Sequence, residues 1–118
     1  MYVLRDVQSQ PLPAVADESG TAQAFVYADT LRITPDFRAS RAGLWEWRSD
    51  GGTFGPIYST GEYSYRISAM RVILTYDCPI NALCANVEYV GTVGSEGLLI
   101  TSGYDRLPLR YERVSRTP

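Results

Sequence analysis

The sequence predicts an all-β, antiparallel domain, a barrel or a sandwich, and three observations lead to that prediction. Helical periodicity is nearly absent from the 118 residues. Short runs rich in β-branched and aromatic residues recur along the chain, and turn-forming residues separate them. Within the runs, apolar and polar residues alternate with the period of two that is typical of half-buried strands. Eight or nine short strands fit a single domain that spans residues 1–118.

The predicted strands follow one another closely after one long connection. The first strand covers residues 2–7, and residues 8–20 form a connection that contains Pro11 and Pro13. Its best helix candidate, residues 14–20, is short and follows these prolines, so we expect a loop or a single turn there. The remaining predicted strands cover residues 22–28, 30–34, 37–49, 57–68, 70–77, 85–93, 97–101 and 107–114. Turn signals separate several of them, at residues 35–36, 50–52, 94–97 and 102–105.

Alternation within the runs predicts which side chains share a face. The shared stripes are Tyr63, Tyr65 and Ile67; Met70, Val72, Leu74 and Tyr76; Val87, Tyr89, Gly91 and Val93; and Leu107, Leu109 and Tyr111. Each stripe is a candidate for the core or for a cavity wall, but a register error of one residue would exchange the two faces. Pro108 interrupts the last run, so we expect it at an edge, a strand start or a bulge.

The amino-acid composition argues against several classes of catalytic and binding function. The chain has no histidine, and all 11 basic residues are arginine. Histidine is the commonest general base and metal ligand, and lysine is required for Schiff-base and P-loop chemistry. The net charge of −2 gives no broad attraction for nucleic acid, and the glycine-rich residues 51–55 precede no helix that could bind phosphate. We therefore expect a non-enzyme with no catalytic residues, no cofactor, no metal site and no nucleic-acid partner.

Cys78 and Cys84 are the two cysteines, and five residues lie between them. This spacing is too wide for a CxxC redox motif, and no second pair completes a zinc site. We expect a local disulfide, with two unrelated thiols as the alternative, and a disulfide implies an oxidising compartment. From the disulfide we expect a secreted or periplasmic protein. The chain enters a strand directly and shows no signal peptide, so an exported protein would be numbered in a mature or trimmed form. No apolar run reaches the roughly 20 residues that cross a bilayer, so we expect no membrane span.

Two motifs near the start of the chain have a recognisable order. Residues 2–7 are followed by Gln10-Pro11-Leu12-Pro13, which matches a first strand and an xGxxLP loop. Residues 29–33 are followed by Pro35-Asp36-Phe37, which matches the pattern tLxLxxDGtF. The glycine of each pattern is missing from this sequence.

The later motifs continue this order. Residues 61–65 match GxYxv, and residues 90–93, 98–100 and 109–113 match closing strands. In this order the chain resembles a largely uncharacterised group of small bacterial lipocalin-like β-barrel proteins over nearly its whole length, although the cysteine-bearing segment departs from the pattern. The resemblance implies an antiparallel up-and-down β-barrel of about eight short strands that can enclose a cavity. It transfers no function, because the group offers no residues of known role.

The aromatic residues suggest where a ligand would bind. Trp45 and Trp47 share one face of their predicted strand, and Phe37 falls on the same face by parity. Such a wall suits an apolar or ring-bearing ligand, but two tryptophans can also simply fill a core. The candidate ligand-binding residues are Trp45, Trp47, Tyr63, Tyr65 and Arg66.

Three carboxylates at mid-strand positions each have an arginine as a plausible neighbour. The carboxylates are Glu46, Glu62 and Glu88, and the arginines are Arg48, Arg66 and Arg110. We expect exposed cross-strand ion pairs, with an inward acid–base pair as the alternative. A carboxylate that faces the interior would need its arginine, because an unpaired buried charge is costly.

Three functional interpretations stay open. The first is an exported binding module that holds an apolar or amphipathic small molecule in an open barrel cavity. The second is a structural or interaction protein that self-assembles, or binds a protein partner, through strand edges and tyrosine-rich faces, with residues 1–13 and 113–118 as candidate arms. The third is an enzyme that shapes a substrate inside the barrel, which rests on fold analogy alone.

Overall fold

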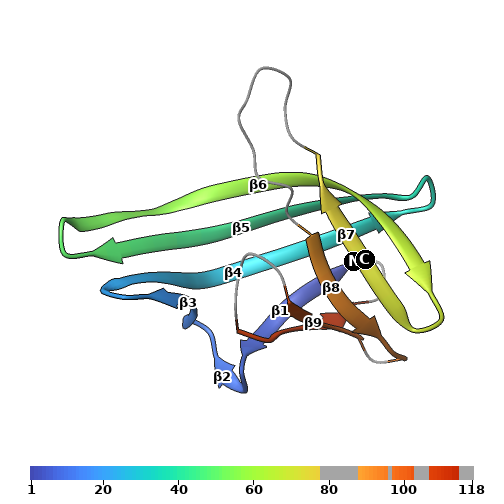
Figure 1. Ribbon diagram of the computed structural model, residues 1–118, viewed down its shortest axis with the longest axis horizontal. Coiled ribbons are helices and arrows are strands. Elements are labelled where there is room, and N and C mark those ends of the chain that lie inside the picture. Colours follow the sequence, from blue (N-terminus) through green and yellow to red (C-terminus); the bar gives the residue numbers. More distant parts are fainter. Residues whose placement is uncertain (78–87, 96, 103–106, 115–118) are drawn as a thin grey trace.

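The computed structural model describes residues 1–77, 88–95, 97–102 and 107–114, and all of its regular structure is β-strand (Figure 1). The all-β prediction is confirmed. One antiparallel sheet contains the ten strands β1 Tyr2–Val7, β2 Gln10–Pro11, β3 Ala14–Ser19, β4 Ala22–Thr34, β5 Arg38–Ser49, β6 Gly52–Ser68, β7 Arg71–Tyr76, β8 Glu88–Val93, β9 Gly97–Ser102 and β10 Leu109–Arg113.

Eight of these strands close into an up-and-down barrel. From β4 to β10 each strand pairs with the next along the chain, β10 pairs with β1, and β1 pairs with β4. The closing contact is short, with Tyr2 opposite Leu31 and Val3 opposite Thr30. Closure pairs the two strands that would otherwise be sheet edges, so the barrel prediction is confirmed and the sandwich alternative is wrong.

The connection predicted for residues 8–20 is partly wrong, because it contains the two extra strands. β2 pairs with the end of β1, and β3 pairs with the first residues of β4. The prolines in this region misled the prediction, since proline is tolerated at strand ends and edges. Residues 1–13 are likewise not a free arm, because β1 is a barrel strand.

β4 is one continuous strand with a bulge, where the sequence predicted two separate runs. Val26 lies opposite Trp45 and Ala28 lies opposite Leu44, so Tyr27 is an extra residue without an opposite partner. A bulge shifts the alternation by one residue. Val26 therefore faces the interior before the bulge and Asp29 faces it afterwards, and both are buried.

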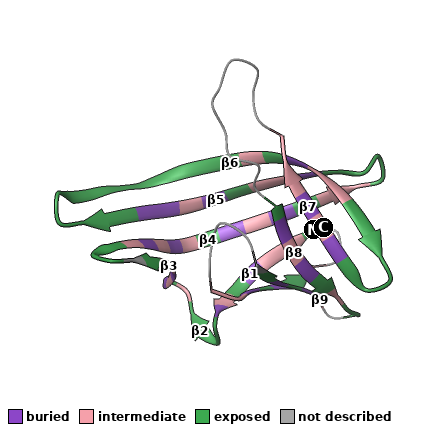
Figure 2. Cartoon of the chain, viewed as in Figure 1, coloured by how far each residue is buried: buried purple, intermediate pink, exposed green. Residues whose placement is uncertain are grey.

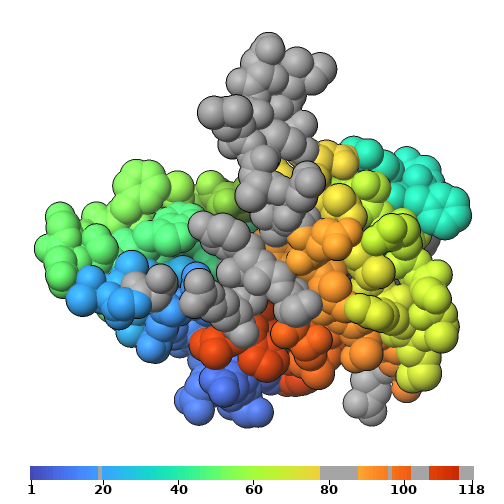
Figure 3. Space-filling view, viewed as in Figure 1, coloured from blue at the N-terminus to red at the C-terminus, as the bar shows by residue number. Residues whose placement is uncertain are grey.

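β6 begins at Gly52, five residues earlier than predicted. Residues 52–56 looked like a long turn, but they pair with the end of β5 through a bulge that places Phe54 opposite Trp47 and Ile57 opposite Trp45. Gly55 permits this bulge with a φ of 105°. The β5–β6 hairpin therefore extends past the rest of the barrel, and its exposed end is green in Figure 2 and lies at the left of Figure 3.

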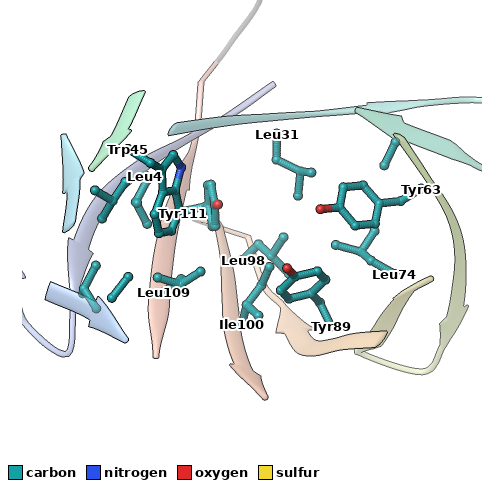
Figure 4. Packing of buried hydrophobic residues seen from close by; sticks show 14 of the residues in the cluster. Leu4, Leu31, Trp45, Tyr63, Leu74, Tyr89, Leu98, Ile100, Leu109 and Tyr111 are labelled. Carbon is teal, nitrogen blue, oxygen red and sulfur yellow. The ribbon is translucent and has the colours of Figure 1, made fainter. Parts of the chain in front are cut away.

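The interior is packed with large apolar side chains from around the barrel (Figure 4). Alternation correctly placed several of them, including Val72, Leu74, Leu109 and Tyr111. Ile67 is exposed instead, because it lies at the end of β6 beside the turn to β7. Pro108 directly precedes β10, which is one of the positions predicted for it.

Candidate functional site

A pocket of about 730 Å³ follows the inner face of the β5–β6 hairpin and leads into the barrel. Strands β3 to β8 all contribute residues to its wall. The wall contains six aromatic side chains, Phe54, Trp47, Trp45, Tyr89, Tyr63 and Tyr76. Figure 4 shows three of them, Trp45, Tyr63 and Tyr89, pointing toward the interior from different strands.

The six rings form two contiguous groups. On the hairpin, Phe54 lies 6.1 Å from Trp47, and Trp47 stacks on Trp45 at 6.4 Å with an interplanar angle of 21°. Deeper in the barrel, Tyr63 lies 5.6 Å from both Tyr76 and Tyr89. Separations of 4.5–7 Å are those of interacting aromatic pairs. The wall therefore has an outer aromatic group, Phe54, Trp47 and Trp45, and an inner aromatic group, Tyr63, Tyr76 and Tyr89.

Arg41 joins the two aromatic groups. Its guanidinium carbon lies 4.9 Å from the centroid of the Trp45 ring and 5.5 Å from that of Tyr89. Both distances are within the range of cation–π attraction. Arg41 shares the inward parity of Trp45 and Trp47 on β5, so the same alternation that builds the aromatic wall places a cation within it.

The carboxylate of Asp29 is the acceptor for four hydrogen bonds beneath this cation. Arg41 Nε donates to Oδ1 at 3.1 Å and to Oδ2 at 3.0 Å, Trp45 Nε1 donates to Oδ2 at 2.8 Å, and the Tyr111 hydroxyl donates to Oδ1 at 2.8 Å. The Asp29 side chain is fully buried. We call Asp29, Arg41, Trp45 and Tyr111 the buried cluster; it ties β4, β5 and β10 together.

Burial and these partners act on Asp29 in opposite directions. Removal from water raises the pKa of its carboxyl group above 3.8, while the charge of Arg41 and the hydrogen bonds from Trp45, Tyr111 and Arg41 lower it; burial is the larger effect. Donors occupy both oxygens, so the carboxylate is held as an acceptor that orients Trp45 and Arg41.

Gly43 makes room for the cluster. It lies opposite Asp29 in the β4–β5 pairing and faces the same interior. A Cβ atom at this position would collide with Asp29 Oδ2 and would lie 2.7 Å from Trp45 Nε1. Only glycine fits this position without moving one of the two side chains.

The structure brings together three of the five predicted ligand-binding residues. Trp45, Trp47 and Tyr63 line the pocket. Tyr65 lies outside it, where its hydroxyl donates to the Thr34 carbonyl oxygen at 2.9 Å. Arg66 is exposed and pairs with Glu88 at 3.3 Å. Ligand binding by these residues stays a prediction.

Two further expectations about this region have different outcomes. Phe37 does not share the face of Trp45, because it lies in the turn before β5 with a φ of 62°, and strand parity does not extend into a turn. Glu46 is buried and accepts a hydrogen bond from Arg48 Nε at 2.6 Å, which is the arginine partner expected for a buried carboxylate. Arg48 also lies over the Phe25 ring, at 4.1 Å.

Sequence reasoning missed Asp29, Arg41 and Gly43. Asp29 falls between two runs that were predicted as separate strands, so no parity was assigned to it. Arg41 had a usable signal, because it lies four and six residues before the two tryptophans and therefore on their face. Gly43 lies between Arg41 and Trp45 on the same face.

Other expectations concern features outside this site. Cys78 and Cys84 lie outside the described residues, so the disulfide stays a prediction. No group of three potential ligands among the described His, Cys, Asp and Glu side chains could hold a metal ion. Among the described residues there is no helix long and apolar enough to span a membrane. Comparison of the chain with protein-family models, curated proteins and solved structures found no match.

Proposed function

We propose that this protein is a binding module that holds an amphipathic, ring-bearing small molecule in the pocket between the β5–β6 hairpin and the barrel interior. The observation that carries the proposal is the aromatic wall around a space of about 730 Å³. Pockets for small molecules are typically 300–1,000 Å³ in volume and lined by apolar and aromatic side chains with a few polar groups.

The outer part of the wall supports binding over simple core filling. Trp47 is 36% exposed and Phe54 is 63% exposed, although both belong to the stacked group that continues into the barrel. A ligand that covers such rings gains about 2.5 kcal/mol for each 100 Å² of apolar surface removed from water. The apolar surface of these rings stays in contact with water in the folded protein, so covering it can contribute to the free energy of ligand binding.

Intrinsic fluorescence offers a direct test. The chain has two tryptophans, and both line the pocket, so all tryptophan emission reports on this site. We expect the uncharged dye N-phenyl-1-naphthylamine to quench this emission saturably while its own emission rises. Trp47→Ala should weaken dye binding about tenfold, which corresponds to about 1.4 kcal/mol of lost contact.

Phe37→Ala is the matched control, because Phe37 is an exposed aromatic residue outside the pocket. It should leave the dye affinity unchanged. Absence of saturable binding to the wild-type protein, or equal losses in both variants, would contradict the proposal. If the dye binds as expected, native mass spectrometry of protein from its natural source would identify the resident ligand by its mass.

A second candidate function is self-association, and one edge of β6 favours it. In the described part of the chain, residues 57–61 pair with β5 on one side only, since pairing with β7 begins at Tyr63. No charged residue lies between Asp50 and Glu62, although charges commonly protect such edges. Tyr58 is 81% exposed on this segment. Two copies would pair antiparallel here without charge repulsion, burying Tyr58 in a two-fold interface.

The oligomeric state tests this second candidate. Light scattering after gel filtration should show a dimer that Ile57→Lys converts to a monomer, because a charge at the edge opposes strand pairing. Arg66→Lys, on the part of β6 that already pairs with β7, is the control and should stay dimeric. A wild-type protein that is monomeric at all concentrations excludes self-association through β6.

A further inference from the structure

The position of Arg41 determines which ligands the proposed pocket accepts. Its guanidinium lies where the outer and inner aromatic groups meet, over Trp45 at 4.9 Å and Tyr89 at 5.5 Å. An arginine in an apolar pocket is usually an anchor for a carboxylate, sulfonate or phosphate on the ligand. Arg41 alone would therefore predict an anionic ligand.

Asp29 opposes that preference. Its carboxylate accepts from Arg41 Nε through both oxygens, at 3.0 and 3.1 Å, and it also lines the pocket. The ion pair is little exposed, with side-chain exposures of 12% for Arg41 and 0% for Asp29. A ligand anion that approached Arg41 would meet the negative charge of Asp29 one ion-pair distance further on. Because Coulomb energy falls with distance, repulsion from the farther Asp29 offsets about half of the attraction to Arg41. The half that remains must still exceed the cost of removing the ligand's charge from water.

The other charged groups of the wall do not restore an anion site. Arg48 donates from Nε to Glu46 at 2.6 Å, so a carboxylate also compensates its charge. Asp17 also lines the pocket, and it is an acidic residue with an interaction of its own. Among the described residues, the wall therefore contains two arginines, each paired with a carboxylate, and one further acidic residue.

The inner wall instead suits an uncharged, flat ring system. Such a molecule would continue the Trp47–Trp45 stack toward the Tyr63 and Tyr89 rings. Because the molecule carries no charge, it can lie over the Asp29–Arg41 ion pair without the cost of removing a charged group from water. Ser59 and Thr60 line the same pocket and offer hydroxyl groups to polar substituents on the ring.

We infer that the pocket selects uncharged ring-bearing molecules over organic acids of the same shape, and that Asp29 is the residue that determines this selectivity by offsetting the charge of Arg41. The inference rests on the proposed binding function. It assigns Asp29 to specificity, with Arg41 as the group through which it acts.

Two dyes of one skeleton test the inference. N-phenyl-1-naphthylamine is uncharged, and 8-anilinonaphthalene-1-sulfonate is the same ring system with one sulfonate. We expect the wild-type protein to bind the uncharged dye at least about tenfold more tightly, a difference of about 1.4 kcal/mol. Asp29→Asn keeps the shape of the side chain but removes the negative charge of Asp29 from beside Arg41, so the sulfonate dye should gain at least about tenfold relative to the uncharged dye.

Asp29→Asn with Arg41→Gln is the matched control. The double variant has no charge at this position, so its preference for the uncharged dye should return toward that of the wild-type protein. Near-ultraviolet circular dichroism establishes that each variant is folded. If Asp29→Asn does not fold, Arg41→Gln alone decides, because it leaves the charge of Asp29 without Arg41 and should weaken binding of the sulfonate dye relative to the uncharged dye.

The outcomes separate the inference from the proposed function. Equal or tighter binding of the sulfonate dye by the wild-type protein overturns the selectivity for uncharged rings. An unchanged dye ratio in folded Asp29→Asn, or in Arg41→Gln where that variant decides, overturns the role of Asp29. If neither dye binds the wild-type protein saturably, the binding function itself fails.

Discussion

Replacing Gly43 with alanine tests whether the buried cluster holds this part of the barrel together. A methyl group there would collide with Asp29 Oδ2 and would lie 2.7 Å from Trp45 Nε1 and 2.8 Å from the Ala28 carbonyl oxygen. Ala28 belongs to the β4–β5 ladder and cannot retreat freely. The carboxylate and the indole must therefore move apart and lose their 2.8 Å hydrogen bond.

The size of the effect follows from these contacts. Overpacking a filled interior costs about 1–3 kcal/mol, and losing a hydrogen bond to a buried charge costs about 1.5–3 kcal/mol. Alanine offsets about 0.5–1 kcal/mol of this, because glycine loses more chain entropy when a strand forms. We expect Gly43→Ala to lower the free energy of unfolding by about 3 kcal/mol.

Urea unfolding followed by tryptophan emission measures this loss, and Gly94→Ala is the control. An added Cβ at Gly94 meets no atom within 4 Å, and its φ is not positive, so the control should stay within about 1 kcal/mol of the wild-type protein. Gly43→Ala should also cost much less in an Asp29→Ala background, where the carboxylate is gone. Similar stability of the Gly43 and Gly94 variants would refute the reasoning.

Three other perturbations have expected outcomes. Tyr111→Phe removes the donor 2.8 Å from Asp29 Oδ1 and should lower the free energy of unfolding by about 1–3 kcal/mol in urea titrations; an unchanged midpoint would contradict a role for that hydrogen bond. Burial raises the pKa of Asp29 above 3.8, so between 3.8 and the raised pKa the folded state binds more protons than the unfolded state. The free energy of unfolding of the wild-type protein, measured relative to that of Asp29→Asn, should therefore fall as the pH rises through this window. A difference between the two proteins that stays constant from pH 3 to pH 7 would contradict the raised pKa. Alkylation of Cys78 and Cys84 in the unfolded, unreduced protein should fail and should succeed after reduction, as mass spectrometry would show; two alkylated thiols before reduction would exclude the predicted disulfide.

Local patterning predicted the fold class because alternation and turn residues are local properties. Val72, Leu74, Leu109 and Tyr111 could be assigned to one face from their own runs, and all four are buried. Trp45 and Trp47 could be placed on one face for the same reason, and they stack. Each of these inferences needed only the period of a strand.

The parts that failed depend on how strands pair. The extra residue Tyr27 in β4 exists only relative to β5, and it reverses the parity of Asp29. The early start of β6 depends on a second bulge, where Gly55 adopts a φ of 105°. Asp29 and Tyr111 are 82 residues apart and meet across the barrel because β1 pairs with both β10 and β4, which no local pattern encodes.

The buried cluster is better explained by the pocket than by stability alone. A buried ion pair loses hydration on both sides, and apolar side chains of similar volume often stabilise an interior equally well or better. Asp29 and Arg41 lie where the filled interior ends and the open aromatic wall begins, and Asp29 accepts the hydrogen bond that fixes the indole of Trp45. An apolar replacement could fill the same space, but it could not orient Trp45 through Nε1 or set the charge that a ligand meets. The buried cluster therefore connects the filled barrel interior with the pocket. β10 and the barrel core support it from one side, and its other side forms part of the pocket wall.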